Sequence, residues 1–395
     1  MKYAMILPDG AADEPLDQLG GQTVLEAAKT PNIDWISTYG RQGRIVTVPK
    51  EFLPGSDVAT LSVVGYDPRT CYTGRAPLEA YAQGIEVGPN DLVFRCNLVT
   101  IDSDVMRDFT AGHISQPEAS RLIADLNAEF ASEPIDFFEG VQYRHLMVLR
   151  DAGDLRCNCT PPHDIPDQPI AGYLPHGDHG ERVQDIMKRA AHVLCDHEVN
   201  KVRCELGDNP ATNIWLWGYG RVKKLPLFAD RFGVKGASIA AVDLIRGITA
   251  LIGFDQINVP TATGYLDTDY VAKGQAAVRA LDQYDLVLVH IEAPDEAGHL
   301  GDYEAKIKAI EEIDQHIVGP VLEKLKSFDA WKIVVVPDHP TPVSTRMHTR
   351  TPPPLCMAGA GIESVMQKPF GETHAQQSKL LIDPGCEMME YFLRA

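Results

Sequence analysis

The sequence predicts an α/β protein built on a mostly parallel sheet with helices on both faces. Four apolar runs have the composition of buried parallel strands, because each is nearly continuous in hydrophobic residues instead of alternating. These runs cover residues 3–10, 43–49, 284–295 and 331–339. Helical segments separate the last runs, and strands that alternate with helices are typical of a parallel sheet covered on both faces.

Two of the segments between strands have the spacing of amphipathic helices. Residues 301–326 place a set of branched apolar side chains on one face of a helix, namely Ile307, Ile310, Ile313, Ile317 and Val318. Residues 271–283 have a similar amphipathic spacing over a shorter segment. We expect both segments to cover the sheet.

The middle of the chain has a different pattern. From about residue 88 to 222 the strands are shorter and more alternating, and a loop rich in proline and histidine at 160–180 interrupts them. We therefore expect a smaller α+β domain inserted into the first one. The expected division is a core domain of residues 1–87 and 223–395 and an inserted domain of residues 88–222.

Composition limits the partners of this protein. The 395 residues are 44% hydrophobic and 23% charged, which is ordinary for a globular chain. The net charge of −19 argues against sequence-independent binding to nucleic acid or to an anionic membrane. An anionic substrate must therefore be held locally, by a few basic side chains or by bound cations.

The ends and cysteines of the chain predict a cytoplasmic protein. The first residues, "MKYAMILPDGAADEP", lack the pattern of a signal peptide, and no apolar run approaches the ~18 residues that a membrane-spanning helix needs. The 8 cysteines are scattered, which indicates reduced thiols. Cys157 and Cys159 form the only close pair, but no second Cys or His pair at usable spacing completes a zinc site.

Three of the predicted buried strands end in an aspartate. These residues are Asp9 in "LPDG", Asp295 in "EAPDEAGH" and Asp338 in "VVPDH". A single aspartate in such a position is commonly a helix cap or a turn former. Three of them together are better explained by a site, because ligands of open α/β sheets bind outside the carboxyl ends of the strands.

Histidines accompany two of these aspartates. Asp295 and His299 are four residues apart at a predicted helix start, so both can face one way. His339 follows Asp338 directly, and His348 lies nine residues further on. Carboxylate and imidazole together suit Zn²⁺, Mn²⁺ or Co²⁺ better than Ca²⁺ or Mg²⁺ alone.

The number of ligands indicates the reaction class. With Asp9 included, six ligands are too many for one tetrahedral ion, and two divalent ions are the natural number. A two-metal site stabilises both the attacking and the leaving oxygen of an in-line displacement, which is phosphoryl-transfer chemistry.

Ser56, in "LPGSDVAT", is the candidate nucleophile. Taken alone, a serine in this position is more often a helix N-cap. Beside two cations, its hydroxyl would have a lowered pKa and could attack phosphorus without a histidine base. Gly55 permits close backbone approach, and Asp57 fits a helix N-terminus that would hold a phosphate.

Other motifs carry less weight. No G-x-x-x-x-G-K-[ST] occurs, which excludes a P-loop kinase. The "HGDH" at 176–179 is typical of a solvated loop, and His145 is expected to be structural. Arg75, Arg95 and Asn97 are candidates for binding an anion, although a surface ion pair is an equally common role for each arginine.

The chain resembles the archaeal-type cofactor-independent phosphoglycerate mutases of the alkaline phosphatase superfamily. The resemblance covers essentially the whole chain and is carried by "ILPDG", "PGSDVATLSVVGYDP", "YTGRAPLEA", "FRCN", "ATGYLDTDY", "EAPDEAGH", "VVPDH" and "MHTRTPPP". It implies an alkaline-phosphatase-like core, a phosphorylated Ser56, and an inserted domain that binds substrate and closes over the site. It also implies two divalent ions (Mn, Zn or Co, with Mg a further candidate) and no 2,3-bisphosphoglycerate. One ion would lie among Asp9, Ser56, Asp338 and His339, and the other among Asp295, His299 and His348.

The resemblance implies conversion of 3-phosphoglycerate into 2-phosphoglycerate. Ser56 would take the phosphoryl group, the glycerate would reorient while enclosed, and its other hydroxyl would take the group back. Water must be excluded, because an open phosphoserine would hydrolyse. A hinge between the domains is therefore expected.

The inserted domain departs from the family pattern. The mutases usually carry Arg-Gly-Asn where this chain has Arg95-Cys96-Asn97. Where they carry Asp-Arg-Arg-Ala-Gly-Arg, this chain reads "MRDFTAGHIS", which leaves Arg107 and His113, and Arg221 comes only after "NIWLWGYG". Fewer cations around a substrate carboxylate keep two other activities open, a homoserine kinase-like phosphotransferase of the same family and a metal-dependent phosphatase.

Two further classes are disfavoured. A sulfatase needs Cys or Ser followed by x-Pro-x-Arg, whereas Ser56 is followed by "DVAT". A non-enzymatic binding protein would have no reason to keep every expected ligand.

Overall fold

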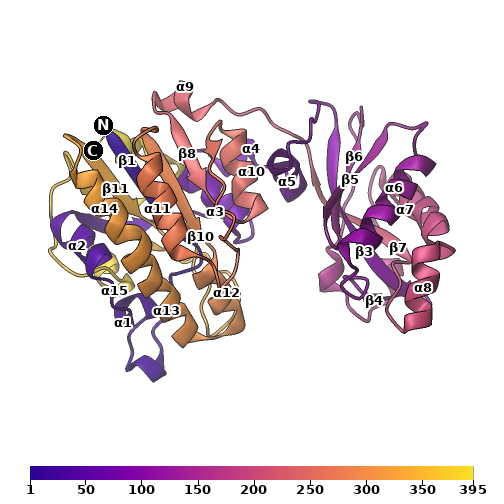
Figure 1. Cartoon of the computed structure of the whole chain (residues 1–395), viewed down its shortest axis with the longest axis horizontal. Coiled ribbons are helices and arrows are strands. Elements are labelled where there is room, and N and C mark those ends of the chain that lie inside the picture. Colours follow the sequence, from indigo (N-terminus) through magenta and orange to yellow (C-terminus); the bar gives the residue numbers. More distant parts are fainter. Residues whose placement is uncertain (395) are drawn as a thin grey trace. The chain divides into compact units, whose positions relative to one another are not determined.

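The chain folds into two compact units, described in a computed structural model of residues 1–394 (Figure 1). The core unit contains Met1–Tyr72 and the chain from Lys224 onward, and the inserted unit contains Thr73–Lys223. The inserted unit begins earlier than residue 88, where the sequence pattern changes. The reason is that α5 (Arg75–Ala82) packs against strands β3 and β7 of that unit.

An eight-stranded sheet forms the centre of the core unit. The strand order is β13-β2-β12-β11-β1-β10-β8-β9, and the run from β11 to β9 is parallel. β12 is antiparallel to both of its neighbours. The prediction of a mostly parallel sheet is confirmed. The strands are β1 (Lys2–Pro8), β2 (Arg41–Ile45), β8 (Gly236–Ile239), β9 (Asp255–Gln256), β10 (Leu286–Ile291), β11 (Trp331–Val335), β12 (Pro354–Gly359) and β13 (Leu381–Ile382).

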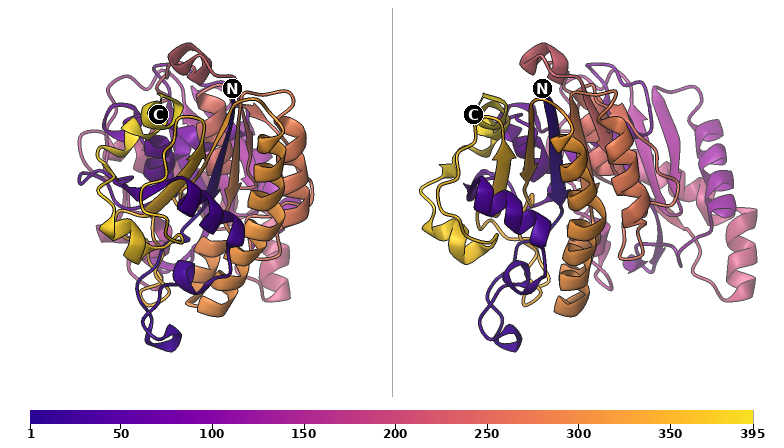
Figure 2. Two further views of the ribbon diagram at one scale, coloured as in Figure 1. Left: turned by 90° about the vertical axis from the view of Figure 1, so that its left-hand side faces the viewer. Right: turned by 60° about the vertical axis from the view of Figure 1, so that its left-hand side comes forward.

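Helices cover this sheet on both faces. Ala4 and Ile6 of β1 point into the larger apolar cluster with α11, α13 and α14, whereas Tyr3 packs on Phe392 of α16. This alternation follows from the two-residue period of a strand. Figure 2 shows α13 and α14 following each other in one long helix, with α11 beside it. The helices of the core unit are α1 (Val24–Ala27), α2 (Pro31–Tyr39), α3 (Ser56–Val63), α4 (Pro68–Cys71), α9 (Phe228–Phe232), α10 (Asp243–Leu251), α11 (Tyr270–Ala280), α12 (Ala293–Leu300), α13 (Tyr303–Ile313), α14 (Gly319–Lys326), α15 (Glu372–Gln377) and α16 (Met388–Arg394).

The predicted helix over 301–326 is helical but not uniform. A π-helical turn at Asp314–Val318 separates α13 from α14. Pro320 lacks the N–H that would bond to the carbonyl of His316, which loosens the ladder at this point. Asp314 is the first residue of this turn. Its carboxylate accepts the backbone N–H of Ile33 at 2.7 Å and so holds the start of α2.

The inserted unit has an antiparallel sheet and a core of its own. β3 pairs with β4, β6 and β7, and β5 extends the sheet beyond β6. Its apolar cluster includes Phe94, Phe130 and Trp215. Besides α5, its elements are β3 (Leu92–Asp102), β4 (Val105–Asp108), α6 (Gln116–Glu129), β5 (Ile135–Val141), β6 (Arg144–Leu149), α7 (Gly180–Cys195), α8 (Glu198–Leu206) and β7 (Asn213–Gly220). Among residues 1–394, no helix is long and apolar enough to cross a membrane.

A buried histidine makes the stability of the inserted unit depend on pH. His145 on β6 is 2% exposed, its Nδ1 accepts the N–H of Gly140 at 3.1 Å, and burial lowers its pKa to about 4. The unfolded chain, with a pKa near 6.5, binds the proton first. The free energy of unfolding should therefore fall as the pH drops from 6.5 to 4, by at most about 1.4 kcal/mol per pH unit.

The test is urea unfolding between pH 7 and 4.5, followed by tryptophan fluorescence. His145→Leu should have a lower slope of stability against pH than the wild type. The same slope in both proteins would contradict this role for His145.

Candidate active site

The ends of three adjacent strands bring the predicted aspartates together. β1 lies between β10 and β11 and runs parallel to both, so their carboxyl ends share one edge. Asp9 follows β1, Asp338 follows β11, and Asp295 lies in the first turn of α12 after β10. With the histidines they form two groups of potential metal ligands, each with its ligand atoms within 4.8 Å of one another. The groups are Asp9, Asp338 and His339, and Asp295, His299 and His348.

Gly10 lets the two groups approach each other. Its φ of +60° lies in the left-handed region that favours glycine, and a Cβ at this position would overlap with Asp295. Its N–H donates to Oδ1 of Asp338 at 3.2 Å. One glycine therefore contacts an aspartate of each group.

Ser56 faces the first group instead of capping its helix. α3 begins at Ser56, and Gly55 occupies the N-cap position. The Ser56 hydroxyl lies 3.1 Å from Nε2 of His339 and 3.4 Å from Oδ1 of Asp9. The helix-cap interpretation of this serine is therefore wrong. Asp57 is held beside it, because its carboxylate accepts the hydroxyl of Tyr72 at 2.6 Å.

The second group is compact and holds its histidines in a defined orientation. Nε2 of His299 lies 3.2 Å from Oδ2 of Asp295 and 2.9 Å from Nε2 of His348. Nδ1 of His299 lies 3.0 Å from the carbonyl oxygen of Arg346. Since a carbonyl only accepts, Nδ1 carries a proton, and in the neutral ring the Nε2 lone pair points into the group.

Thr341 joins the two groups, and the sequence analysis did not select it. Its fully buried hydroxyl donates to Oδ1 of Asp295, and its oxygen lies 3.3 Å from Nδ1 of His339. The hydroxyl proton is used on Asp295, so Nδ1 of His339 is the donor of the second bond. A lone threonine after "PDHP" carries no signal of this role, which depends on the packing of α12 against this loop.

The electrostatics of the site favour bound cations. Burial raises the pKa of Asp9 well above its usual value, and the charge of Asp338 raises it further. Burial and then the charge of Asp295 raise the pKa of Glu292 to about 8. The hydrogen bond to Asp295 raises the pKa of His299 to about 9. Carboxylates buried together destabilise one another unless a proton or a cation neutralises them.

The residues present fit divalent metal ions. Oδ1 of Asp338 accepts the N–H groups of Gly10 and His339, but the buried Oδ2 has no hydrogen-bond partner among residues 1–394. A buried carboxylate oxygen without a hydrogen-bond donor is explained by a bound cation. The mixture of carboxylate and imidazole donors matches the transition metals that the sequence predicts.

A third group of potential ligands was missed. It consists of Asp9, His290 and Glu292, with Nε2 of His290 2.8 Å from Oδ2 of Asp9 and 3.6 Å from Oε2 of Glu292. Burial lowers the pKa of His290 to about 3. Both residues lie in the run "VHIEAPD", where a histidine and a glutamate interrupt an apolar strand end, and this interruption was the available signal.

Three candidate anion-binding residues of the inserted unit share partners. Glu79 accepts Nε of Arg75 and Nε of Arg95, each at 3.0 Å. The Arg95 guanidinium lies 4.3 Å over the ring of Trp217, whose Nε1 donates to Asn97 at 3.0 Å. These contacts form a polar group with two arginines and one carboxylate on α5, β3 and β7.

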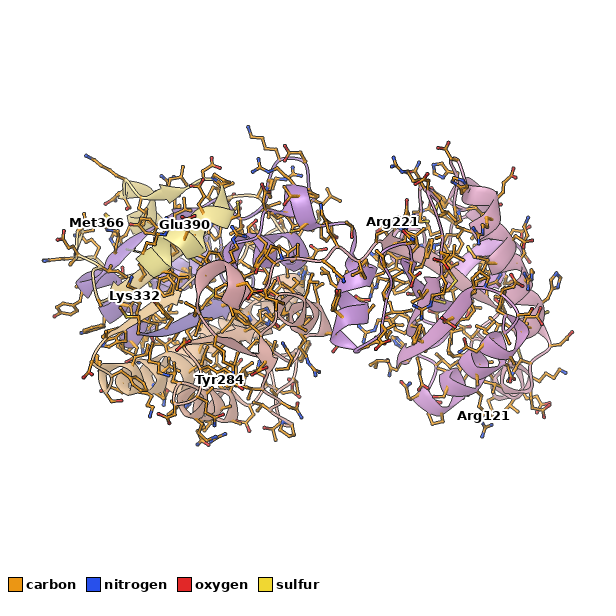
Figure 3. The ribbon with its side chains drawn as sticks, turned by 90° about the horizontal axis from the view of Figure 1, so that it is seen from above. Arg121, Arg221, Tyr284, Lys332, Met366 and Glu390 are labelled. Carbon is orange, nitrogen blue, oxygen red and sulfur yellow. The ribbon has the colours of Figure 1, made fainter. Side chains whose placement is uncertain are left out.

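The other three candidates have separate partners. Arg107 lies 3.5 Å from Asp167, and both side chains are exposed. Arg221, labelled in Figure 3, donates to the carbonyl oxygens of Asn90 and Gly153. His113 is exposed at a φ of +49°, with its ring 6.4 Å from that of Tyr143.

The cysteine pair does not gain further ligands. The sulfur atoms of Cys157 and Cys159 lie 3.5 Å apart. Within the described part of the chain, these two cysteines belong to no group of three potential metal ligands. The candidate metal site is therefore the one at the carboxyl ends of β1, β10 and β11.

Fold and site together define a class of protein. A mostly parallel α/β sheet carries, at one edge, a serine hydroxyl among carboxylate and imidazole groups that fit divalent cations. This arrangement is that of metal-dependent phosphoryl-transfer enzymes.

Comparison with known proteins identifies the family. Residues 38–200 match the family model described as 2,3-bisphosphoglycerate-independent phosphoglycerate mutase. The chain is 49% identical over 358 residues to the protein of that name from Methanosarcina mazei, covering 90% of each chain. It is 44% identical to the one from Methanosarcina barkeri over the whole of both chains. This chain belongs to the 2,3-bisphosphoglycerate-independent phosphoglycerate mutase family, as the sequence motifs indicated.

Solved structures agree with this result. A protein from Pyrococcus horikoshii is similar over 99% of this chain and 96% of its own, with a TM-score of 0.84 at 28% identity. The cofactor-independent phosphoglycerate mutase from Thermoplasma acidophilum is similar over 100% and 99% of the two chains, with a TM-score of 0.72 at 26% identity.

A methyl group at Gly10 should disrupt metal binding. In Gly10→Ala, the Cβ overlaps with Asp295, so this residue must shift relative to His299 and His348. Elemental analysis of the purified variant should find less bound transition metal than in the wild type.

Gly20→Ala is the matched control. Gly20 has nearly the same φ, +65°, but nothing lies within 4 Å of an added Cβ. It should lose about 1 kcal/mol of stability from backbone strain and keep its metal. Equal metal content in Gly10→Ala and Gly20→Ala would show that close approach at Gly10 is unimportant.

Proposed function

We propose that this protein interconverts 3-phosphoglycerate and 2-phosphoglycerate, with Ser56 as the residue that is transiently phosphorylated. The observation that carries the proposal is the position of the Ser56 hydroxyl, 3.1 Å from His339 and 3.4 Å from Asp9, at the start of α3. The names of the relatives in Methanosarcina support the same activity.

The bonds exchanged are two phosphate esters. Oγ of Ser56 forms a bond to phosphorus while the ester bond of the substrate breaks, and the alkoxide that leaves takes up the proton that Ser56 loses. The other hydroxyl of the glycerate then attacks the phosphoserine, and Ser56 regains a proton. The reaction therefore needs no external phosphate donor.

In this scheme the residues at the sheet edge hold two divalent ions and keep the ligands of these ions in place. Asp9, Ser56, Asp338 and His339 would hold one divalent ion, and Asp295, His299 and His348 would hold a second one, with Mn²⁺, Zn²⁺ and Co²⁺ as the candidates. Divalent ions at this position lower the pKa of a serine hydroxyl and neutralise charge on the phosphoryl oxygens. Thr341 keeps Asp295 and His339 in a fixed relation through its two hydrogen bonds.

The inserted unit is the proposed source of substrate recognition. Arg75 and Arg95 share one carboxylate, so the group that they form with Glu79 keeps a net positive charge. A substrate carboxylate or phosphate could compete with Glu79 for these guanidinium groups. Arg107, His113, Arg221 and Asn97 are the other proposed contacts to substrate. Exclusion of water by this unit would keep the phosphoserine from hydrolysis.

The proposal predicts that Ser56→Ala abolishes turnover. The assay supplies 3-phosphoglycerate and detects 2-phosphoglycerate with enolase. The variant should lose at least about a thousandfold in kcat, because it lacks the hydroxyl on which the proposed phosphoserine forms. Mass spectrometry of the wild type with substrate should find one phosphoryl group on the peptide that contains Ser56.

Ser62→Ala is the control, since Ser62 is buried on the same helix and lies outside the site. Its activity should stay near that of the wild type. The parallel assay contains ATP and homoserine. Turnover in that assay alone would replace the mutase with the kinase-like activity, and release of inorganic phosphate alone would indicate a phosphatase.

A further inference from the structure

His290 lies in a group that could hold a third cation if only donor atoms are counted. The group contains Asp9, His290 and Glu292, and neither His290 nor Glu292 belongs to the two groups around Ser56. We propose that His290 is instead a positioning residue, whose Nε2–H donates to Oδ2 of Asp9 and thereby turns Oδ1 of Asp9 toward Ser56. The effect on turnover rests on the proposed function, but the effect on metal binding does not.

The location of one proton distinguishes a histidine ligand from a histidine donor. A neutral imidazole has a single N–H, and a histidine that binds a metal through one nitrogen donates from the other. His299 has this arrangement, because its Nδ1 lies 3.0 Å from the carbonyl oxygen of Arg346. His339 has it as well, because its Nδ1 lies 3.3 Å from Oγ1 of Thr341. Both therefore present an Nε2 lone pair to a cation.

His290 has the opposite arrangement. The side chain is fully buried, and its Nδ1 has no hydrogen-bond partner among residues 1–394. If Nε2 bound a cation, the proton would be on Nδ1 and would be a buried donor without an acceptor, which folded proteins almost never tolerate. With the proton on Nε2, the 2.8 Å contact to Oδ2 of Asp9 is a hydrogen bond with a donor and an acceptor.

The two oxygens of Asp9 then have different partners. Oδ2 is taken by His290, while Oδ1 lies 3.4 Å from Oγ of Ser56 and 3.5 Å from Nε2 of His339. Oε2 of Glu292 is 3.6 Å from Nε2 of His290, which is too far for a hydrogen bond. Asp9 is therefore the acceptor of the Nε2–H group. The hydrogen bond fixes the rotation of the Asp9 carboxylate.

The backbone holds His290 in place. It pairs with Leu7 in the register of β1 and β10, and its carbonyl oxygen accepts Nζ of the fully buried Lys273 at 3.1 Å. The donor therefore comes from the strand next to the one that leads to Asp9. This is the geometry of a rigid support, in which neither partner can swing away alone.

Two substitutions separate a donor from a ligand. His290→Gln keeps an N–H that can reach the place of Nε2–H but is a poor ligand for transition metals, whereas His290→Leu keeps the apolar volume without a donor. Each metal-stripped protein is titrated with Co²⁺ and followed by its visible absorption, and kcat and KM for 3-phosphoglycerate are measured on the reloaded proteins.

His290→Leu should bind the same number of Co²⁺ equivalents as the wild type, with one of them weakened by about 10–100-fold. Its kcat should fall while KM stays within about twofold, because the change acts on the orientation of Asp9 and not on substrate binding. His290→Gln should recover most of the Co²⁺ affinity and of kcat.

The control is His145→Leu, the same change at a buried histidine of the inserted unit, which should leave the Co²⁺ titration unchanged. Loss of one Co²⁺ equivalent in both His290 variants would make His290 a ligand and overturn the proposal. An unchanged titration in His290→Leu, or a Gln variant no better than Leu, would do the same. If His290→Leu does not fold, the number and affinity of Co²⁺ ions in His290→Gln decide the question. Absence of turnover in the wild type would refute the proposed function and leave the titration as a valid test.

Discussion

The pairing of β1 with β10 on one side and β11 on the other is the interaction on which the site depends. Parallel strands end at one edge, so this pairing collects the chain at Asp9, near residue 295 and at Asp338. The register matters as much as the pairing. A shift of one residue would move every side chain to the opposite face of the sheet, and His290 would no longer meet Asp9.

The edge formed in this way concentrates negative charge. Asp9, Glu292, Asp295 and Asp338 lie at one place, and burial raises the pKa of two of them. Specific contacts offset part of the free-energy cost of burying these carboxylates. One of them is the hydrogen bond that the hydroxyl of Thr341 donates to Asp295. Local destabilisation of this kind is typical of functional sites, where charge is kept for a ligand and not for folding.

The residues proposed for chemistry and those proposed for substrate binding lie on different kinds of sheet. The core unit places its functional groups at the ends of parallel strands, whereas the inserted unit carries Arg95 and Asn97 within an antiparallel strand. There the arginines are already engaged, since Glu79 binds Arg75 and Arg95 and Trp217 covers the guanidinium of Arg95. In the proposed reaction, substrate would have to compete with Glu79 for these donors.

The sequence by itself determined the fold class, the aspartates at the strand ends and the choice of Ser56 as candidate nucleophile. The first two features are local, because apolar runs reveal buried strands and the residue after such a run lies at a sheet edge. Ser56 was selected only in combination with those strand-end ligands. Only the tertiary structure revealed the hydrogen bond of His290 to Asp9, the bridge by Thr341 and the start of the inserted unit at Thr73. Each of these depends on contacts between segments far apart in the chain, 281 residues in the case of Asp9 and His290, and on the direction of a single proton. No periodicity or spacing in one sequence encodes such a contact.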